Sequence, residues 1–280
     1  MLIAVAAFSL MDTAMKFLSA HYPAMQVTAM RALSSLPLVC TYLAWRGAFR
    51  HVLKVRWSLH ILRGVLGVVM LTSFAFGLRL LSLAEAYSIF FIAPTLITAL
   101  SVFILKEKVD AARWCAIAVG LGGVLVVLRP NSDDFFSIGG LAVLAAAACY
   151  AASAIAGRVL SRTDASESIV FWLMVMMALG GVALSAHQWV AIRAEDWWML
   201  AGLAVSGFIG QLAMTEAFRM GKASSVAPFE YSALAWGMGL DWLLWRTLPD
   251  EYTLLGAAII IASGVYLVRR EAVHVESEHP

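Results

Sequence analysis

The feature that most constrains the fold is a series of long apolar runs that few charges interrupt. Residues 83–105 and 114–128 form the clearest pair, joined by the charged hinge Lys106-Glu107-Lys108-Val109-Asp110. A helix needs roughly 20 apolar residues to cross a hydrocarbon core about 30 Å thick. The first run is long enough, and the second reaches across with its flanking residues. The pair is therefore typical of a transmembrane hairpin.

Runs of this kind recur along the whole chain. Only 14% of the residues are charged, whereas a soluble domain has about a quarter. The sequence predicts an all-α polytopic membrane protein of ten transmembrane helices. The expected spans are residues 1–18, 25–45, 59–78, 82–105, 113–128, 138–157, 168–188, 197–217, 224–245 and 253–269. The connections are short, so we expect one membrane domain.

Lys and Arg residues gather in alternate connections. If the N-terminus is cytoplasmic, thirteen lie in cytoplasmic segments and five in outer segments, namely Lys16, Arg79, Arg129, Arg193 and Arg246. Cytoplasmic loops of membrane proteins carry an excess of these residues. Both termini are therefore predicted to be cytoplasmic.

An internal repeat relates the two halves of the chain. A shift of 141 residues places Val119–Arg129 on Ile260–Arg270 and Gly123 on Gly264. Because each half has five spans, an odd number, the second half enters the membrane from the opposite side. We predict inverted five-helix repeats over residues 1–135 and 136–270, then a cytoplasmic tail over residues 271–280. Inverted repeats are typical of secondary transporters, which bind substrate near the midplane between the halves.

Short motifs in both halves carry a resemblance to a known family. They are Leu83–Tyr87, Pro94, Lys106–Val109, Gly120, Gly123 and Arg129-Pro130, with a degenerate second copy in Phe229–Trp245 and Gly256–Arg270. With these motifs the chain resembles the EamA-type ten-helix branch of the drug/metabolite transporter superfamily. Within that branch it is similar to bacterial aromatic amino-acid exporters of the YddG type.

The resemblance implies a bacterial inner-membrane exporter of small metabolites. It also implies a central cavity lined by spans 1, 3, 4, 6, 8 and 9, with spans 5 and 10 at one side. The second copy departs from the family pattern, because Leu248-Pro249-Asp250-Glu251 replaces the glutamate-led hinge.

Candidate substrate-binding residues cluster in the fourth and sixth spans. Tyr87, Phe90, Phe91 and Pro94 recur at i, i+3, i+4 and i+7, so they share one helical face. Such a stripe either packs or lines a site. Tyr87 favours a site, because a phenol inside a membrane needs a hydrogen-bond partner. Tyr150 in the sixth span is a further candidate.

The eighth and ninth spans add polar groups at depth, where they usually face the bundle interior or a wet cavity. Gln211 is expected to bind either a polar group of the substrate or a neighbouring helix. Glu230 is the leading candidate for binding a proton or an amine, with Tyr231 beside it. Trp236 lies near the midplane and is either core or cavity wall.

Three acids are candidates for ion coupling: Asp12, Glu85 and Glu230. For Asp12 the alternative is a local partner one turn on, Lys16. For Glu85 it is an interfacial position near Arg79.

Two arginines also fall within the spans. Arg31 either extends to the membrane surface or pairs with Asp12, and Arg63 is placed where its side chain can extend to the cytoplasm. No grouping of His, Cys and carboxylates has the spacing of a metal site or a catalytic triad. We therefore predict no enzyme activity, metal or cofactor, and the basic clusters indicate membrane anchoring rather than nucleic-acid binding.

The sequence thus predicts a secondary transporter that exports aromatic or other neutral amino acids by alternating access. The expected partners are the small-molecule substrate and the lipid bilayer, and the protein is expected to be a monomer or a weak homodimer. The alternatives are export of cationic drugs or other metabolites, or a membrane scaffold without transport.

Overall fold

The computed structural model describes residues 1–48, 52–77, 80, 83–128, 137–245 and 251–278, and helices make up most of these ranges. The helices are α1 (Leu2–Ser19), α2 (Ala24–Trp45), α4 (Trp57–Gly77), α5 (Leu83–Phe90), α6 (Ala93–Ile104), α7 (Ala111–Leu128), α9 (Ile138–Leu160), α10 (Ser166–Ser185), α11 (Trp197–Met220), α12 (Ala223–Val226), α13 (Ala233–Trp245) and α14 (Glu251–Glu278). Three 3₁₀ segments join them: η1 (Ala186–Gln188), η2 (Ala194–Asp196) and η3 (Ala227–Ser232).

These elements form ten transmembrane helices in two inverted repeats of five. The pair α5–α6 makes the fourth span, and α12, η3 and α13 together make the ninth. Six segments are long and apolar enough to cross a membrane: Leu2–Ser19, Met25–Trp45, Trp57–Phe74, Ile138–Leu160, Ser166–Gln188 and Ala194–Met220. Helices dominate because a spanning segment must satisfy its backbone hydrogen bonds internally.

Two of the predicted spans, the fourth and the ninth, each consist of more than one helical segment. In the fourth span α5 ends at Phe90 and α6 begins at Ala93. Pro94 lies in the first turn of α6, where a missing N–H removes no helical hydrogen bond. In the ninth span a 3₁₀ segment with Pro228 in its first turn interrupts the helix.

The predicted polar tail begins as helix, because α14 continues through residue 271 to Glu278.

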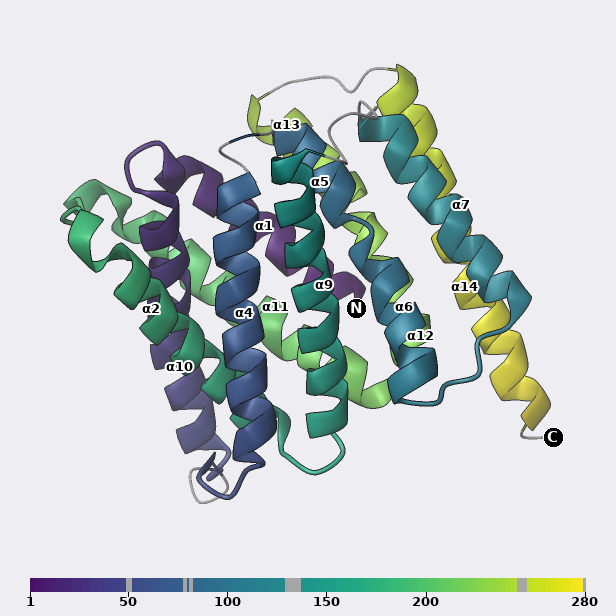
Figure 1. Cartoon of the computed structure of the whole chain (residues 1–280), viewed down its shortest axis with the longest axis horizontal. Coiled ribbons are helices and arrows are strands. Elements are labelled where there is room, and N and C mark those ends of the chain that lie inside the picture. The colour runs from purple at the N-terminus through teal and green to yellow at the C-terminus, as the bar shows by residue number, and fades with distance from the viewer. Residues whose placement is uncertain (49–51, 78–79, 81–82, 129–136, 246–250, 279–280) are drawn as a thin grey trace.

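The helices associate in pairs that combine the two repeats (Figure 1). The largest contacts are between α4 and α9, α7 and α14, α2 and α10, and α1 and α11. The pair α7–α14 lies at one edge of the molecule, where the resemblance placed spans 5 and 10. A Cβ on Gly123 would lie 3.0 Å from the backbone oxygen of Gly256, so this glycine allows α7 to approach α14 closely.

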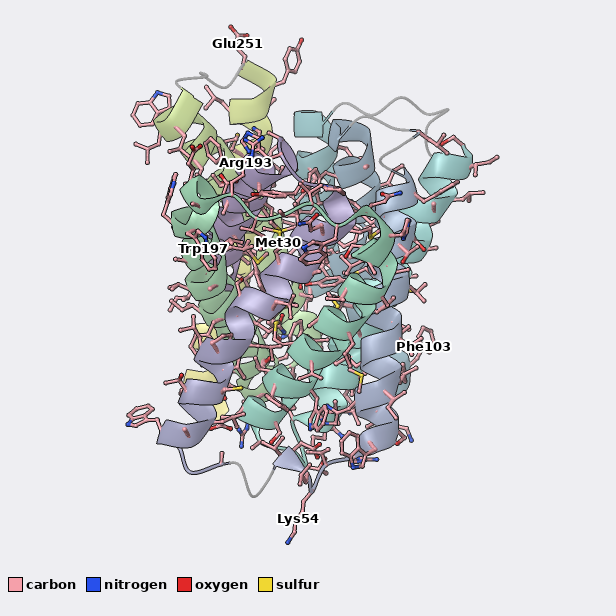
Figure 2. All side chains as sticks on the ribbon, turned by 90° about the vertical axis from the view of Figure 1, so that its left-hand side faces the viewer. Met30, Lys54, Phe103, Arg193, Trp197 and Glu251 are labelled. Carbon is pink, nitrogen blue, oxygen red and sulfur yellow. The ribbon has the colours of Figure 1, made fainter. Side chains whose placement is uncertain are left out.

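The two ends of the bundle carry different polar contacts. Figure 2 shows Lys54 at one end, here called the inner end, and Arg193 and Glu251 at the other, the outer end. At the outer end the Tyr22 hydroxyl donates to Asp196 over 2.7 Å, and the Gln26 amide donates to the backbone oxygen of Val190 over 2.6 Å. These bonds tie the α1–α2 connection to the segment between α10 and α11.

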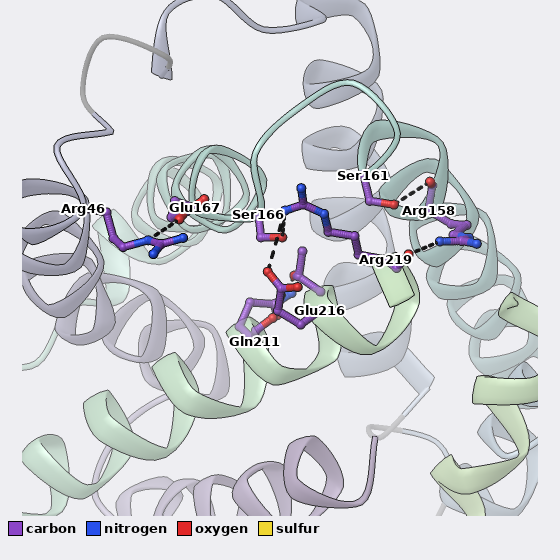
Figure 3. A network of polar contacts seen from close by, with 9 residues as sticks. Arg46, Arg158, Ser161, Ser166, Glu167, Gln211, Glu216 and Arg219 are labelled. Atoms are coloured by element: carbon purple, nitrogen blue, oxygen red, sulfur yellow. Dashed lines mark hydrogen bonds and ion pairs between the residues drawn. The ribbon is translucent and has the colours of Figure 1, made fainter. Parts of the chain in front are cut away.

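At the inner end a polar network joins α2, α9, α10 and α11 (Figure 3). Arg46 pairs with Glu167 at 3.1 Å, Arg219 donates to the Ser166 hydroxyl at 3.1 Å, and Arg158 donates to the backbone oxygen of Arg219. Hydrogen bonds and an ion pair from charged side chains therefore hold the predicted cytoplasmic ends of these helices together.

A buried hydrogen bond between His60 and Asp164 anchors α4 nearby. His60 lies 2.9 Å from the Asp164 carboxylate, with side chains 1% and 3% exposed, and Thr163 and the Arg56 N–H also donate to Asp164. Burial opposes ionisation of this carboxyl group, but the three donors outweigh burial and lower the pKa of Asp164.

Candidate substrate site

The breaks in the fourth and ninth spans occupy corresponding positions in the two repeats. The shift of 141 residues that relates the repeats places Phe91, in the first break, on Ser232, the last residue of η3. The two breaks lie close together, because α6, which follows the first break, packs against η3, which forms the second. Secondary transporters bind substrate at such discontinuous helices. The pair of breaks therefore marks the candidate site.

An aromatic cluster lies beside the first break and brings α4, α5 and α9 together. Its members are Phe74, Tyr87, Phe90, Phe91 and Tyr150. The Phe74 ring lies 5.8 Å from Tyr87 and 5.3 Å from Phe90, and Phe90 lies 5.6 Å from Tyr150. These are contact distances for aromatic pairs. Of the predicted stripe, Phe90 thus meets Tyr150 of another span, while Tyr87 contacts Phe74 and Phe91 contacts Tyr87.

Charged groups of both signs adjoin this cluster. The Tyr150 hydroxyl donates to Oε1 of Glu230 over 3.1 Å, which joins α9 to η3. Asp12 on α1 is exposed and interacts electrostatically with Arg31 on α2 and with Tyr87. Arg31 also interacts with Tyr150. The aromatic cluster and the charged group Asp12, Arg31 and Glu230 therefore form one continuous constellation.

Arg31 has a further partner that fixes its side chain. Its guanidinium carbon lies 5.8 Å from the centroid of the Phe8 ring, within cation–π range. Of the two alternatives for Arg31, the structure shows the interaction with Asp12.

Four other predicted residues occupy different surroundings. Tyr231 is 2% exposed, its hydroxyl lies 3.1 Å from that of Thr95, and its ring lies 6.3 Å from Phe91, so it packs behind the cluster. Pro94 is buried at the start of α6. Gln211 is 5% exposed on α11, and Trp236 is 45% exposed on α13.

Glu85 falls on α5, but its side chain lies outside the described residues. Sequence reasoning also misjudged Arg63, which is 7% exposed and therefore does not extend to the cytoplasm. Arg63 is buried because α9 packs over it. No local pattern in the sequence predicts which helix lies there.

A clamp at the inner end joins the two repeats through Glu107 in the charged hinge. Its carboxylate accepts hydrogen bonds from the N–H groups of Ala223 and Ser224, at 2.9 and 3.0 Å, and from the Ser224 hydroxyl at 2.7 Å. Burial raises the pKa of this carboxyl group, but these donors together with Ser101 outweigh burial and lower the pKa of Glu107. The clamp therefore holds the hinge of the first repeat against the start of α12.

Comparison with known proteins finds relatives that align with nearly the full length of this chain. The pseudopaline exporter CntI of Pseudomonas aeruginosa is 27% identical over 263 residues, which cover 94% of this chain and 92% of that protein. The S-adenosylmethionine uptake transporter of Rickettsia prowazekii is 25% identical over 279 residues, covering 99% and 94%. The riboflavin transporter of Vibrio cholerae is 26% identical over 275 residues, covering 97% and 92%.

A protein of known crystal structure has the same fold, with a TM-score of 0.82, 20% identity and 93% coverage of both chains. None of the three relatives described above is named as an aromatic amino-acid exporter, so the relatives support a transporter without confirming the predicted substrate. The EamA-like transporter family matches twice, over residues 1–129 and 137–270, and the chain therefore belongs to that family of multi-pass membrane transporters.

Proposed function

We propose that this protein exports amino acids with aromatic or other neutral side chains across the bacterial inner membrane by alternating access. The observation that carries the proposal is the hydrogen bond from Tyr150 of the aromatic cluster to Glu230 in the ninth span, with Arg31 close enough to Tyr150 for its charge to act there. An amino acid presents an apolar side chain, an ammonium group and a carboxylate. The constellation offers a complement to each of these three parts.

Glu230 is proposed to bind the ammonium group or a coupling proton. Ionisable residues inside a membrane are costly and mark substrate or ion paths. The hydrogen bond from Tyr150 holds Oε1 and so orients the carboxylate of Glu230. Asp12 is the second acid, and Arg31 balances its charge.

Contacts at the inner end support the proposal that the cytoplasmic side is closed in this conformation. The Glu107 clamp crosses from one repeat to the other. Behind it Ile97, Ala154 and Val226 form part of one buried apolar cluster contributed by α6, α9 and α12. Under the proposal, the site in this conformation communicates with the outer side, and transport requires the clamp to open.

The topology belongs to the same proposal. Residues 1–135 and 136–270 are the repeats, residues 271–280 and the N-terminus are cytoplasmic, and the protein acts as a monomer or a weak homodimer.

Counterflow in proteoliposomes tests the substrate class. Vesicles that contain the protein and are loaded with unlabelled phenylalanine should accumulate labelled phenylalanine, tryptophan and leucine, and empty vesicles should not. S-adenosylmethionine, riboflavin and an organic cation serve as competitors. The first two are chosen because two relatives are named as their transporters. If one of these exchanges and no amino acid does, the substrate proposal is wrong while transport itself stands.

A substitution tests the role of Glu230. Glu230→Gln keeps the shape and a hydrogen-bond acceptor for Tyr150 but removes the charge. We expect at least about a tenfold loss of counterflow and loss of the response to a pH gradient, since charged hydrogen bonds contribute about 1.5–3 kcal/mol. Glu195→Gln, in the exposed η2 turn, is the matched control. A wild-type rate and pH response in Glu230→Gln would remove the proposed role.

A further inference from the structure

Arg63 is a buried cation without a complete set of partners. The residue is on α4 and is 7% exposed. Among the residues that the structure describes, its Nε and Nη1 atoms have no hydrogen-bond partner. A guanidinium group carries only donors, and leaving them unpaired away from water is costly. A protein that retains such a group has a reason other than stability.

The guanidinium group lies against α9, at Gly157. A Cβ built on Gly157 would lie 3.2 Å from Cζ of Arg63, 3.3 Å from Nη2 and 3.4 Å from Nε. Glycine at this position therefore leaves the space that the guanidinium group occupies. Tyr150 is seven residues earlier on α9, on the same helical face, and lies close enough to Arg63 for a charge on one side chain to affect the other. Arg63 thus lies on the inner side of the candidate site.

The nearby acids are engaged elsewhere. Asp164 accepts from His60, Thr163 and the Arg56 N–H. Glu230 accepts from Tyr150, and Asp12 interacts with Arg31 rather than with Arg63. Tyr150 is neutral in its hydrogen-bonded form and supplies no negative charge. The two arginines therefore differ: Arg31 has a carboxylate and an aromatic ring, whereas Arg63 has no anion among the side chains that the structure describes.

We propose that Arg63 binds the carboxylate of the transported solute when the site opens towards the cytoplasm. The inference rests on the proposed function and assigns a residue to the anionic end of the substrate. The side chain is covered in the present conformation, in which the Glu107 clamp is closed. Opening of the inner end uncovers it, and the incoming carboxylate supplies the missing acceptor. Glu230 and the aromatic cluster then take the ammonium group and the side chain.

The first test compares a solute with its uncharged analogue. Counterflow is measured with phenylalanine and with phenylalanine amide, which lacks the carboxylate. Arg63→Gln should raise the KM for phenylalanine about tenfold or more and leave that for the amide within about twofold. Gly157→Ala should act in the same direction, since the added methyl group displaces the guanidinium group. The controls are Arg162→Gln, which is exposed, and Gly202→Ala, whose added Cβ meets nothing within 4 Å.

A second measurement separates binding from a structural role. Arg63→Met removes the unpaired charge and keeps an unbranched side chain in place of the arginine stem. If Arg63 is held for the substrate, the ligand-free variant should unfold at a temperature equal to or above that of the wild type. The shift of the unfolding temperature by phenylalanine should disappear. A variant that loses stability without ligand and keeps the shift would show that Arg63 is structural.

The two proposals fail in different ways. If no amino acid is transported but other aromatic carboxylates stabilise the wild type and not Arg63→Met, the substrate proposal fails and Arg63 remains an anion-binding residue. If amino acids are transported and Arg63→Gln affects acid and amide equally, the inference about Arg63 is wrong while the proposed function stands.

Discussion

The Glu107 clamp leads to a quantitative prediction about conformational equilibrium. Its carboxylate accepts three hydrogen bonds of 2.7 to 3.0 Å from the start of α12. A hydrogen bond to a charged group contributes about 1.5–3 kcal/mol when buried, but this carboxylate is only partly buried and water screens it. We therefore assign the three together about 2–3 kcal/mol in favour of the closed inner end. Since about 1.4 kcal/mol is a factor of ten, Glu107→Ala should raise the open population by roughly 30- to 150-fold.

Chemical labelling of a buried position at the inner end measures this shift. Ala154 is 6% exposed within the apolar seal. We would introduce Ala154→Cys after replacing the native cysteines Cys40, Cys115 and Cys149 with serine. A maleimide that cannot cross membranes is added to inside-out vesicles. With Glu107→Ala the labelling rate should rise by at least about tenfold, because labelling follows the open population.

The control is Lys108→Ala, which alters an exposed residue of the same hinge. A labelling rate that changes by less than about threefold in Glu107→Ala would refute the clamp. The pH dependence gives a second check. The pKa of Glu107 is lowered in the closed state, so deprotonation favours closure above the ordinary pKa of about 4.3, and closure weakens as the pH falls below it. Titration of Glu107 should therefore leave the closed population unchanged between about pH 6 and 8.

Two further predictions concern stability. Asp164→Ala should destabilise the protein by about 1–3 kcal/mol, because it leaves the buried His60 ring without its hydrogen-bond partner. Thermal unfolding in detergent at pH 7 would measure the loss. Since the pKa of Asp164 is lowered, its contribution is fully present above the ordinary pKa of about 3.9 and is lost as the pH falls through the lowered pKa, so the gap between variant and wild type should narrow only in that acidic range. Gly123→Val should cost about 1–3 kcal/mol, because its side chain meets Ile260 and the backbone of Gly256, and an equal unfolding temperature would contradict that packing.

The helical spans could be predicted from hydropathy, because a membrane leaves the backbone few alternatives. The first span was expected at residues 1–18 and α1 is Leu2–Ser19. The breaks could not be predicted in the same way. Pro94 falls on Ala235 under the repeat shift, and Pro228 falls on Tyr87, so no pair of prolines marks the two breaks. Equivalent backbone geometry arises here from different local sequences.

The candidate site was predictable in part. Helical spacing placed Tyr87, Phe90 and Phe91 on one face, and the structure brings this face to Tyr150, with Glu230 bonded to the Tyr150 hydroxyl. Spacing does not show which helix lies opposite, so it missed the burial of Arg63 under α9. For the same reason it missed the partners of Glu107, which lie 116 and 117 residues further along the chain.

The paired packing of the helices has a mechanical consequence. Both α1 and α2 belong to the first half of the sequence, but they make extensive contacts with α10 and α11 of the second, and α4 packs against α9 (Figure 1). The bonds from Tyr22 and Gln26 extend this association to the outer loops. Separating the sequence halves as rigid units would break the largest interfaces in the molecule. The parts that move as units during a transport cycle must therefore each combine helices from both repeats, so the boundary between the sequence repeats is not the boundary between the moving parts.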